Sequence, residues 1–170
     1  MRSTTGLAVL FAVLAAVLQI AVAPNIAIAG VAPNFLLLMV VISAMVDGPR
    51  RGMSMGFALG FVYDLTTTGP VGPGTLVFTL VGFMAGQMRQ NMFSSGWIAP
   101  LMVFSISTLS AEVLYVLVGK VLGSGVPFWS SFLLRMLPST VYDTVLALAL
   151  FPWITDVVKR RKRMGVSPRF

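Results

Sequence analysis

The chain contains no cysteine and no histidine among its 170 residues. The absence of cysteine excludes disulfides and thiol nucleophiles. The absence of histidine excludes histidine general bases, histidine ligation of haem and, together with the missing thiols, zinc sites of ordinary composition. We therefore expect no metal, no cofactor and no enzyme of these classes.

Charge is also scarce. Only 10% of the residues are charged, against about 25% in an average soluble domain. Hydrophobic residues make up 57% of the chain and the mean hydropathy is +0.92. Residues 3–46 and 90–111 contain no ionisable side chain, and mostly apolar runs of 18 or more residues indicate membrane spans. The sequence predicts one integral membrane domain, residues 1–158, and a basic cytoplasmic tail, residues 159–170.

Breaks in the apolar pattern predict an all-α, polytopic membrane protein built as a compact bundle of six transmembrane helices. The expected spans are approximately residues 6–27, 33–46, 52–67, 75–88, 96–122 and 129–154. A span of 14 residues reaches only about 21 Å, less than the roughly 30 Å hydrocarbon core. We therefore expect the short second, third and fourth spans to borrow uncharged flanking residues, to thin the bilayer or to be shielded by longer neighbours. The tripeptide APN, at 23–25 and 32–34, is expected to frame the turn between the first two spans.

Lysine and arginine are distributed unevenly along these spans. With the N-terminus inside, ten of the twelve lie on the inner side, which predicts that both termini are cytoplasmic. The N-terminus resembles a secretory signal, because Arg2 precedes an apolar run that ends in AVA, residues 21–23, as at a cleavage site. Pro24 follows at once and disfavours cleavage, so we expect an uncleaved first span. The tail is predicted to be a membrane-surface anchor, with an acidic partner or nucleic acid as the alternative. Its basic residues are Lys159, Arg160, Arg161, Lys162 and Arg163.

Small residues recur at every fourth position in the third and fourth spans. In GMSMGFALGFVYDL, residues 52–65, three glycines precede Asp64 at this spacing, which keeps them near one helix face. Close backbone approach is a main source of packing between helices in lipid. The pattern predicts either packing between the two spans or a groove for a partner's transmembrane helix, because both need the same approach. The glycines of this candidate groove are Gly52, Gly56, Gly60, Gly82 and Gly86.

Several polar residues fall inside the predicted spans. Ionisable groups in a bilayer usually face the bundle interior and pair with one another. Arg135 is the first candidate partner of Asp64, and it is also expected within reach of Glu112 or Asp143 if Pro138 kinks the sixth span. The set fits an internal network that fixes helix register, and a proton or ion relay, a solute site, a partner contact or a catalytic dyad are the alternatives. The members of this intramembrane polar network are Asn34, Asp64, Glu112, Arg135 and Asp143.

The tripeptide VYD occurs twice, ending at Asp64 and at Asp143. Paired aspartates on two helices suggest an intramembrane aspartyl protease, in which two carboxylates act as a general acid and base. Neither aspartate has the Gly-x-Gly-Asp context of those enzymes, so we do not favour this hypothesis. The repeat is also compatible with a weak inverted repeat of three spans.

The motif order resembles a known family. PNFLLLMVV is followed by GPRRGMSMGFALGFVYDL, then by GPVGPGTLVFTLVGFMAGQMR and a basic tail. This is similar to MreD, the bacterial rod-shape-determining membrane proteins, over almost the whole chain. The resemblance implies family motif positions at Pro33, Asn34, Gly56, Gly60, Asp64, Gly69, Gly72, Gly82 and Gly86. Many relatives carry aspartate where this chain has Asn34, so an ionic role there is not expected.

The resemblance also implies a function. It predicts a non-enzymatic, multi-pass subunit of the cell-elongation complex in the bacterial inner membrane, helping to organise lateral-wall peptidoglycan synthesis and cell shape. The implied partners are an MreC-like bitopic protein, RodA with its class B penicillin-binding protein, an MreB-like filament and membrane lipids, with a homodimer left open and no nucleic acid expected. The implied fold is similar to the S-components of energy-coupling-factor transporters, so the alternative is a small-solute-binding subunit with Asn34, Asp64 and Arg135 near its site.

Overall fold

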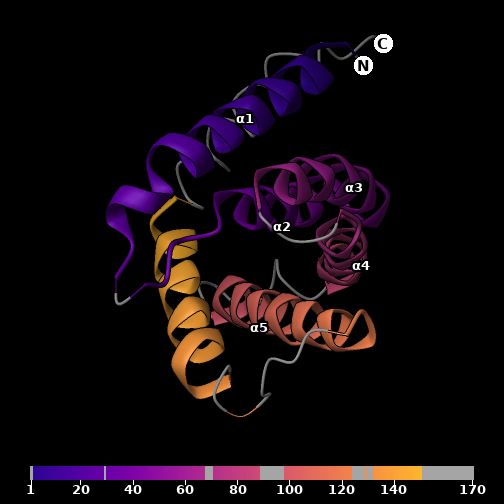
Figure 1. Cartoon of the computed structure of the whole chain (residues 1–170). Helices are drawn as coiled ribbons and strands as arrows, with labels where there is room; N and C mark the ends of the chain where they lie inside the picture. Colours follow the sequence, from indigo (N-terminus) through magenta and orange to yellow (C-terminus); the bar gives the residue numbers. More distant parts are fainter. Residues whose placement is uncertain are drawn as a thin grey trace, which may run out of the picture.

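The computed structural model describes residues 2–28, 30–67, 71–88, 98–123, 129 and 132–150, and this part of the chain is helical. Its one β pairing is an isolated bridge between Ile28 and Val31. Figure 1 shows the helices gathered into one bundle. They are α1 (Arg2–Ala21), the short η1 (Ala23–Ile26), α2 (Phe35–Asp47), α3 (Pro49–Thr66), α4 (Pro73–Gln87), α5 (Ile98–Val121) and a final helix, Phe132–Leu150, that opens with the π-helical turn η3 (Phe132–Met136).

The all-α prediction is confirmed, and a described helix coincides with each of the six predicted spans. The largest difference is in α1, which ends at Ala21 and is followed by η1, and the last span runs outside the described residues. The breaks have local causes. Gly48 adopts φ +94° between α2 and α3, a backbone conformation that favours glycine, and Pro49 then starts α3. Both APN tripeptides act as expected: Asn25 Nδ2 donates to Ala21 O at the end of α1, and Asn34 caps α2.

The short helix α2 is the centre of the bundle. Every residue from Phe35 to Met45 is buried, and α2 packs against α1, α3, α4 and α5. A helix that is apolar on all sides belongs in a core. Its 13 residues span only about 20 Å. The expected shielding of this short span by its neighbours is therefore what the structure shows.

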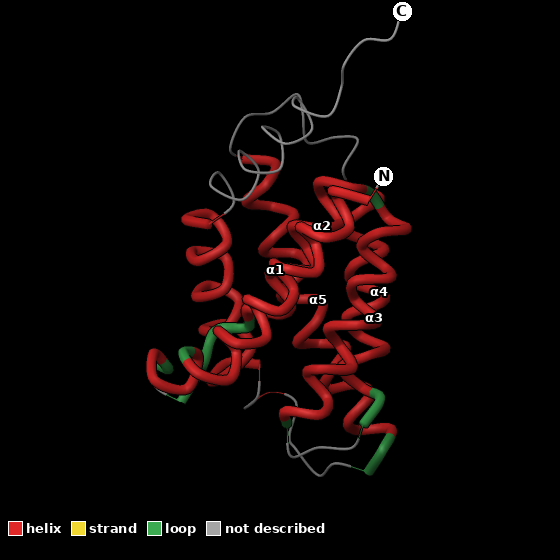
Figure 2. Tube along the Cα trace, turned by 90° about the horizontal axis from the view of Figure 1, so that it is seen from above, coloured by secondary structure: helices red, strands yellow, loops and turns green. Residues whose placement is uncertain are grey.

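Helices α3 and α4 lie side by side as a hairpin (Figure 1; Figure 2). The glycines meet at this contact. A methyl group on Gly60 would stand 2.6 Å from Gly74 O, and one on Gly56 would overlap the backbone of Phe78. Gly52 and Gly82 face each other in the same way. These distances are shorter than real Cβ contacts, so only glycine permits the helices to approach this closely.

The candidate groove is therefore occupied by the chain itself. Gly86 completes the contact, because a methyl group there would overlap Pro49 at the start of α3. Of the two predicted roles for these glycines, packing within the chain accounts for all five. A partner helix would reach these glycines only if α3 and α4 separated.

The outer faces of the helices are apolar. On α3, each residue that follows a buried member of the ladder is exposed, and these residues are Met53, Phe57, Phe61 and Leu65. Helices α1, α4 and α5 also expose leucine, isoleucine, valine, phenylalanine or methionine. On α3 the ladder glycines and Asp64 are thus buried, and the apolar residues that follow them are exposed. This arrangement is expected of a protein that is surrounded by lipid.

Two helices, Leu101–Val121 and Phe132–Leu150, are long and apolar enough to cross a membrane by length and composition. Two shorter apolar helical stretches, Val9–Ala21 and Phe35–Asp47, accompany them. The π-helical turn lies just before Pro138, whose ring nitrogen has no hydrogen to donate to Leu134 O. The predicted disturbance of this helix by Pro138 thus takes the form of a wider turn.

We expect Gly56→Ala to destabilise the protein strongly. The added methyl group overlaps the backbone of Phe78, so the hairpin must open, and overpacking of this kind costs about 1–3 kcal/mol. Gly6→Ala is the matched control, because a methyl group there meets nothing within 4 Å, and helical Gly→Ala changes are neutral or stabilising by up to about 1 kcal/mol. Thermal unfolding followed by size-exclusion chromatography measures both. Equal unfolding midpoints for the two variants would contradict the packing described here.

Candidate functional site

The carboxylate of Asp64 binds the start of helix α4. Its Oδ1 accepts a hydrogen bond from Gly74 N at 2.7 Å. Its Oδ2 accepts from Gly72 N at 2.9 Å, from Thr75 N at 2.8 Å and from the Thr75 hydroxyl at 2.7 Å. The first N–H groups of a helix have no partner within that helix, and the helix dipole favours a negative charge there. Asp64, 1% exposed, therefore supplies the cap that the N-cap residue of α4, Gly72, lacks.

Local sequence makes this cap geometrically feasible. Asp64 lies in the last turn of α3, one ladder step beyond Gly60, and so faces α4. Gly72 adopts φ +129°, and Pro73 starts α4 without needing a donor of its own. At Gly74 a methyl group would stand 2.5 Å from Asp64 Oδ1. A larger residue at that position would push the carboxylate away from the helix start.

The structure gives Asp64 hydrogen-bond partners other than the predicted Arg135. Both carboxylate oxygens of Asp64 are already engaged by donors of the α4 start and the turn before it. The side chain of Arg135 lies outside the described residues, so an ion pair with Asp64, Glu112 or Asp143 stays a prediction. The basic tail residues 159–163 also lie outside the described residues.

A second cluster of polar side chains surrounds the start of α2. Asp143 Oδ1, from the final helix, accepts a hydrogen bond from Asn34 N at 2.8 Å. Asn34 Oδ1 in turn accepts from Leu37 N at 3.0 Å. Gln19 of α1 accepts from Phe35 N at 2.8 Å and donates to Pro33 O at 3.3 Å. Residues from three helices thus satisfy one helix start.

Gln19 was missed by the sequence reasoning, which weighed charged groups and Asn34 only. The signal was present, because Gln19 is the one amide within the apolar residues 6–22 of the first span. A polar side chain at such a position usually has an internal partner.

The two VYD tripeptides place their aspartates in similar roles. Asp64 binds backbone N–H groups at the start of α4, and Asp143 binds one at the start of α2. The two carboxylates bind different helix starts, and both oxygens of Asp64 already accept hydrogen bonds. These contacts give both aspartates a structural role and do not support the aspartyl protease hypothesis.

Further polar contacts join the final helix to its neighbours. The Ser139 hydroxyl donates to Glu112 Oε1 of α5 at 3.0 Å, and the Tyr142 hydroxyl donates to Ile26 O of η1 at 2.9 Å. The structure therefore brings Asn34, Asp143 and Glu112 together around the final helix and places Asp64 separately, at the turn between α3 and α4.

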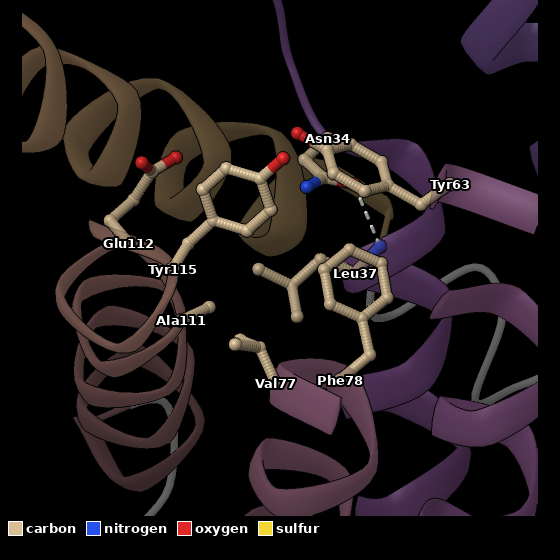
Figure 3. Close-up of a pocket in the computed structure, with 8 residues that line it drawn as sticks. All are labelled: Asn34, Leu37, Tyr63, Val77, Phe78, Ala111, Glu112 and Tyr115. Atoms are coloured by element: carbon tan, nitrogen blue, oxygen red, sulfur yellow. Dashed lines mark hydrogen bonds between the residues drawn. The ribbon is translucent and has the colours of Figure 1, made fainter. Parts of the chain in front are cut away.

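A small cavity of about 20 Å³ lies beside the second cluster. Figure 3 shows its lining side chains, which come from α2, α3, α4 and α5. They are Asn34, Leu37, Tyr63, Val77, Phe78, Ala111, Glu112 and Tyr115. Small-molecule sites usually have about 300–1,000 Å³, so this cavity does not accommodate a vitamin-sized solute.

We expect loss of the Asp64 cap to destabilise the hairpin. Asp64→Ala removes a charged acceptor from donors that would then be buried without partners, at a cost of about 2 kcal/mol or more. Thr75→Val removes one donor and leaves the three backbone donors in place, so its effect should be clearly smaller. Thermal unfolding in detergent is the measurement. An unfolding midpoint for Asp64→Ala at or above that of Thr75→Val would contradict the capping role.

Comparison with known proteins gives one family. A family model described as rod shape-determining protein MreD matches residues 1–161. No curated protein and no solved structure matches the chain. MreD proteins are membrane proteins that act in rod shape determination, and they are not a known enzyme family. The matched segment includes both aspartate caps and the glycine contact, and the chain therefore belongs to the rod shape-determining protein MreD family.

Proposed function

We propose that this protein is a non-enzymatic, multi-pass subunit of the cell-elongation complex that binds the transmembrane helix of an MreC-like bitopic partner. In this role it helps to organise lateral-wall peptidoglycan synthesis, together with RodA, a class B penicillin-binding protein and an MreB-like filament. Membership of the MreD family supports a role in rod shape determination. The distribution of lysine and arginine supports six spans with both termini in the cytoplasm.

The observation that carries the binding proposal is an apolar groove of about 440 Å³ on the outer face of the α3–α4 hairpin. We call it the hairpin groove. Phe57 and Phe61 of α3 form one wall, and Leu76 and Leu80 of α4 form the other. All four side chains are between 43% and 60% exposed. Val71, Gly72, Thr75 and Thr79 complete the lining.

The floor of the hairpin groove suits a helix. Thr75 and Thr79 are one turn apart, and small residues at such spacing let a neighbouring helix approach closely. Their hydroxyls are already satisfied, since Thr75 donates to Asp64 and Thr79 donates to Thr75 O at 2.6 Å. The floor therefore offers compact contact surface without donors that a partner would have to satisfy. Rigid packing of α3 on α4 holds the two walls in place.

The alternative, a small-solute-binding subunit of the S-component type, has less support. Its candidate residues Asp64 and Asn34 have separate partners: Asp64 binds the start of α4, and Asn34 lies at the start of α2. The described cavity next to Asn34 is far smaller than a solute site. No solved structure supports the likeness to S-components.

We expect the double variant Phe57→Ala, Phe61→Ala to lose co-purification with the MreC-like partner. Aromatic anchors at the centre of an interface contribute about 2 kcal/mol or more each, so loss of even one should weaken binding by about thirtyfold, and the double variant should weaken it further. The measurement is recovery of the partner from native membranes, normalised to the amount of folded protein.

Phe83→Ala is the matched control, because Phe83 of α4 is 42% exposed, close to the 46% of Phe61, but does not line the groove. Its partner recovery should equal that of the unmodified chain. Unchanged recovery for the double variant would refute the groove as the docking surface, and equal loss in both variants would show that the effect is not specific to it.

A further inference from the structure

The small cavity between α2, α3, α4 and α5 has polar groups on one side and apolar groups on the other. Figure 3 shows the side chains of Glu112 and Tyr115 extending from α5, with the Tyr115 hydroxyl directed toward Asn34 and the Glu112 carboxylate directed toward the final helix, where it accepts from Ser139. Glu112 and Tyr115 are three residues apart and so share a helix face. Leu37, Val77 and Phe78 close the apolar side.

Two of these polar groups have hydrogen-bonding capacity to spare. Asn34 uses its side-chain oxygen to accept from Leu37 N, and its Nδ2 hydrogens have no partner in the part of the chain that the structure describes. The Tyr115 hydroxyl likewise has no hydrogen bond within the described residues, although its ring packs edge-on against Tyr63 at 6.0 Å. In the described residues every fully buried side-chain N or O atom has a hydrogen-bond partner. Asn34 and Tyr115 are half-buried and line the cavity, so their spare donors are available to a small polar molecule there.

We propose that this cavity binds one water molecule, which links the start of α2 to α5. A site needs roughly 10–15 Å³ to hold one water, and the cavity offers about 20 Å³. The water accepts a hydrogen bond from Asn34 Nδ2, donates to the Glu112 carboxylate and bonds with the Tyr115 hydroxyl. Three bonds are what a buried water typically makes.

The chemistry of the lining favours water over other occupants. A hard cation such as calcium takes six or more oxygen ligands, and the lining side chains offer fewer, one of which already accepts from Leu37 N. A lipid head group or a solute exceeds the volume. The water also extends the Asp143–Asn34 contact to α5, so that the α2 start is joined to α1, α5 and the final helix.

Radiolytic footprinting of the full chain in lipid nanodiscs, in water labelled with oxygen-18, tests the site. Hydroxyl radicals formed from a bound water label its neighbours, so Tyr115 should acquire oxygen-18. Ala111→Val adds two methyl groups to the cavity wall and removes no polar group, so it should sharply reduce labelling of Tyr115. Ala58→Val makes the same change on an exposed face and should leave the labelling unchanged.

Equal labelling of Tyr115 in the two variants, or no labelling in the unmodified chain, would overturn the proposal. A second measurement does not depend on whether Ala111→Val folds. A high-resolution map of the unmodified protein should show a density peak about 2.7–3.2 Å from Asn34 Nδ2 and Tyr115 Oη. An empty cavity, or a peak with contacts of about 2.3–2.6 Å to several oxygens as for a hard cation, would refute it.

Discussion

Every helix that starts inside this bundle must find partners for its first N–H groups, and in lipid no bulk water supplies them. The chain meets this constraint twice with an aspartate. Asp64 satisfies the start of α4, and Asp143, with Gln19 and Asn34, satisfies the start of α2. The starts of α2 and α4 can therefore be buried, and α2 can be the short core around which the other helices pack.

The glycine contact and the Asp64 cap depend on each other. Gly52, Gly56 and Gly60 let α3 approach α4 closely enough for the next ladder position, Asp64, to reach the α4 backbone. The cap in turn fixes where α4 begins relative to α3, and so fixes which residues oppose the glycines. The outward faces of the same two helices are thereby held in register, and they form the hairpin groove. One internal contact thus positions the surface that we assign to partner binding.

Much of the fold was predictable because apolar runs and Gly-Pro breaks have strong local causes. The approximate helix bounds and the turn that the two APN tripeptides frame follow from such patterns. The central position of the second span shows only in the structure. The capping of α4 by Asp64 was not predictable from the charges, because backbone N–H groups at a helix start do not appear in a sequence as charges. The pairing of Asp64 with Arg135 stays a prediction. The use of the glycines was also ambiguous, since four-residue spacing is the same whether the partner is α4 or another chain. Only the structure shows which side of α3 remains open.

The central claim is that the Asp64 carboxylate holds the first amides of α4, and hydrogen–deuterium exchange tests it directly. The amides of Gly74 and Thr75 are donors to this carboxylate. In the full chain in nanodiscs they should exchange as slowly as amides in the middle of α4, whereas the first amides of an uncapped helix exchange quickly because they have no partner. Rapid exchange of both amides, with slow exchange in the rest of α4, would contradict the account.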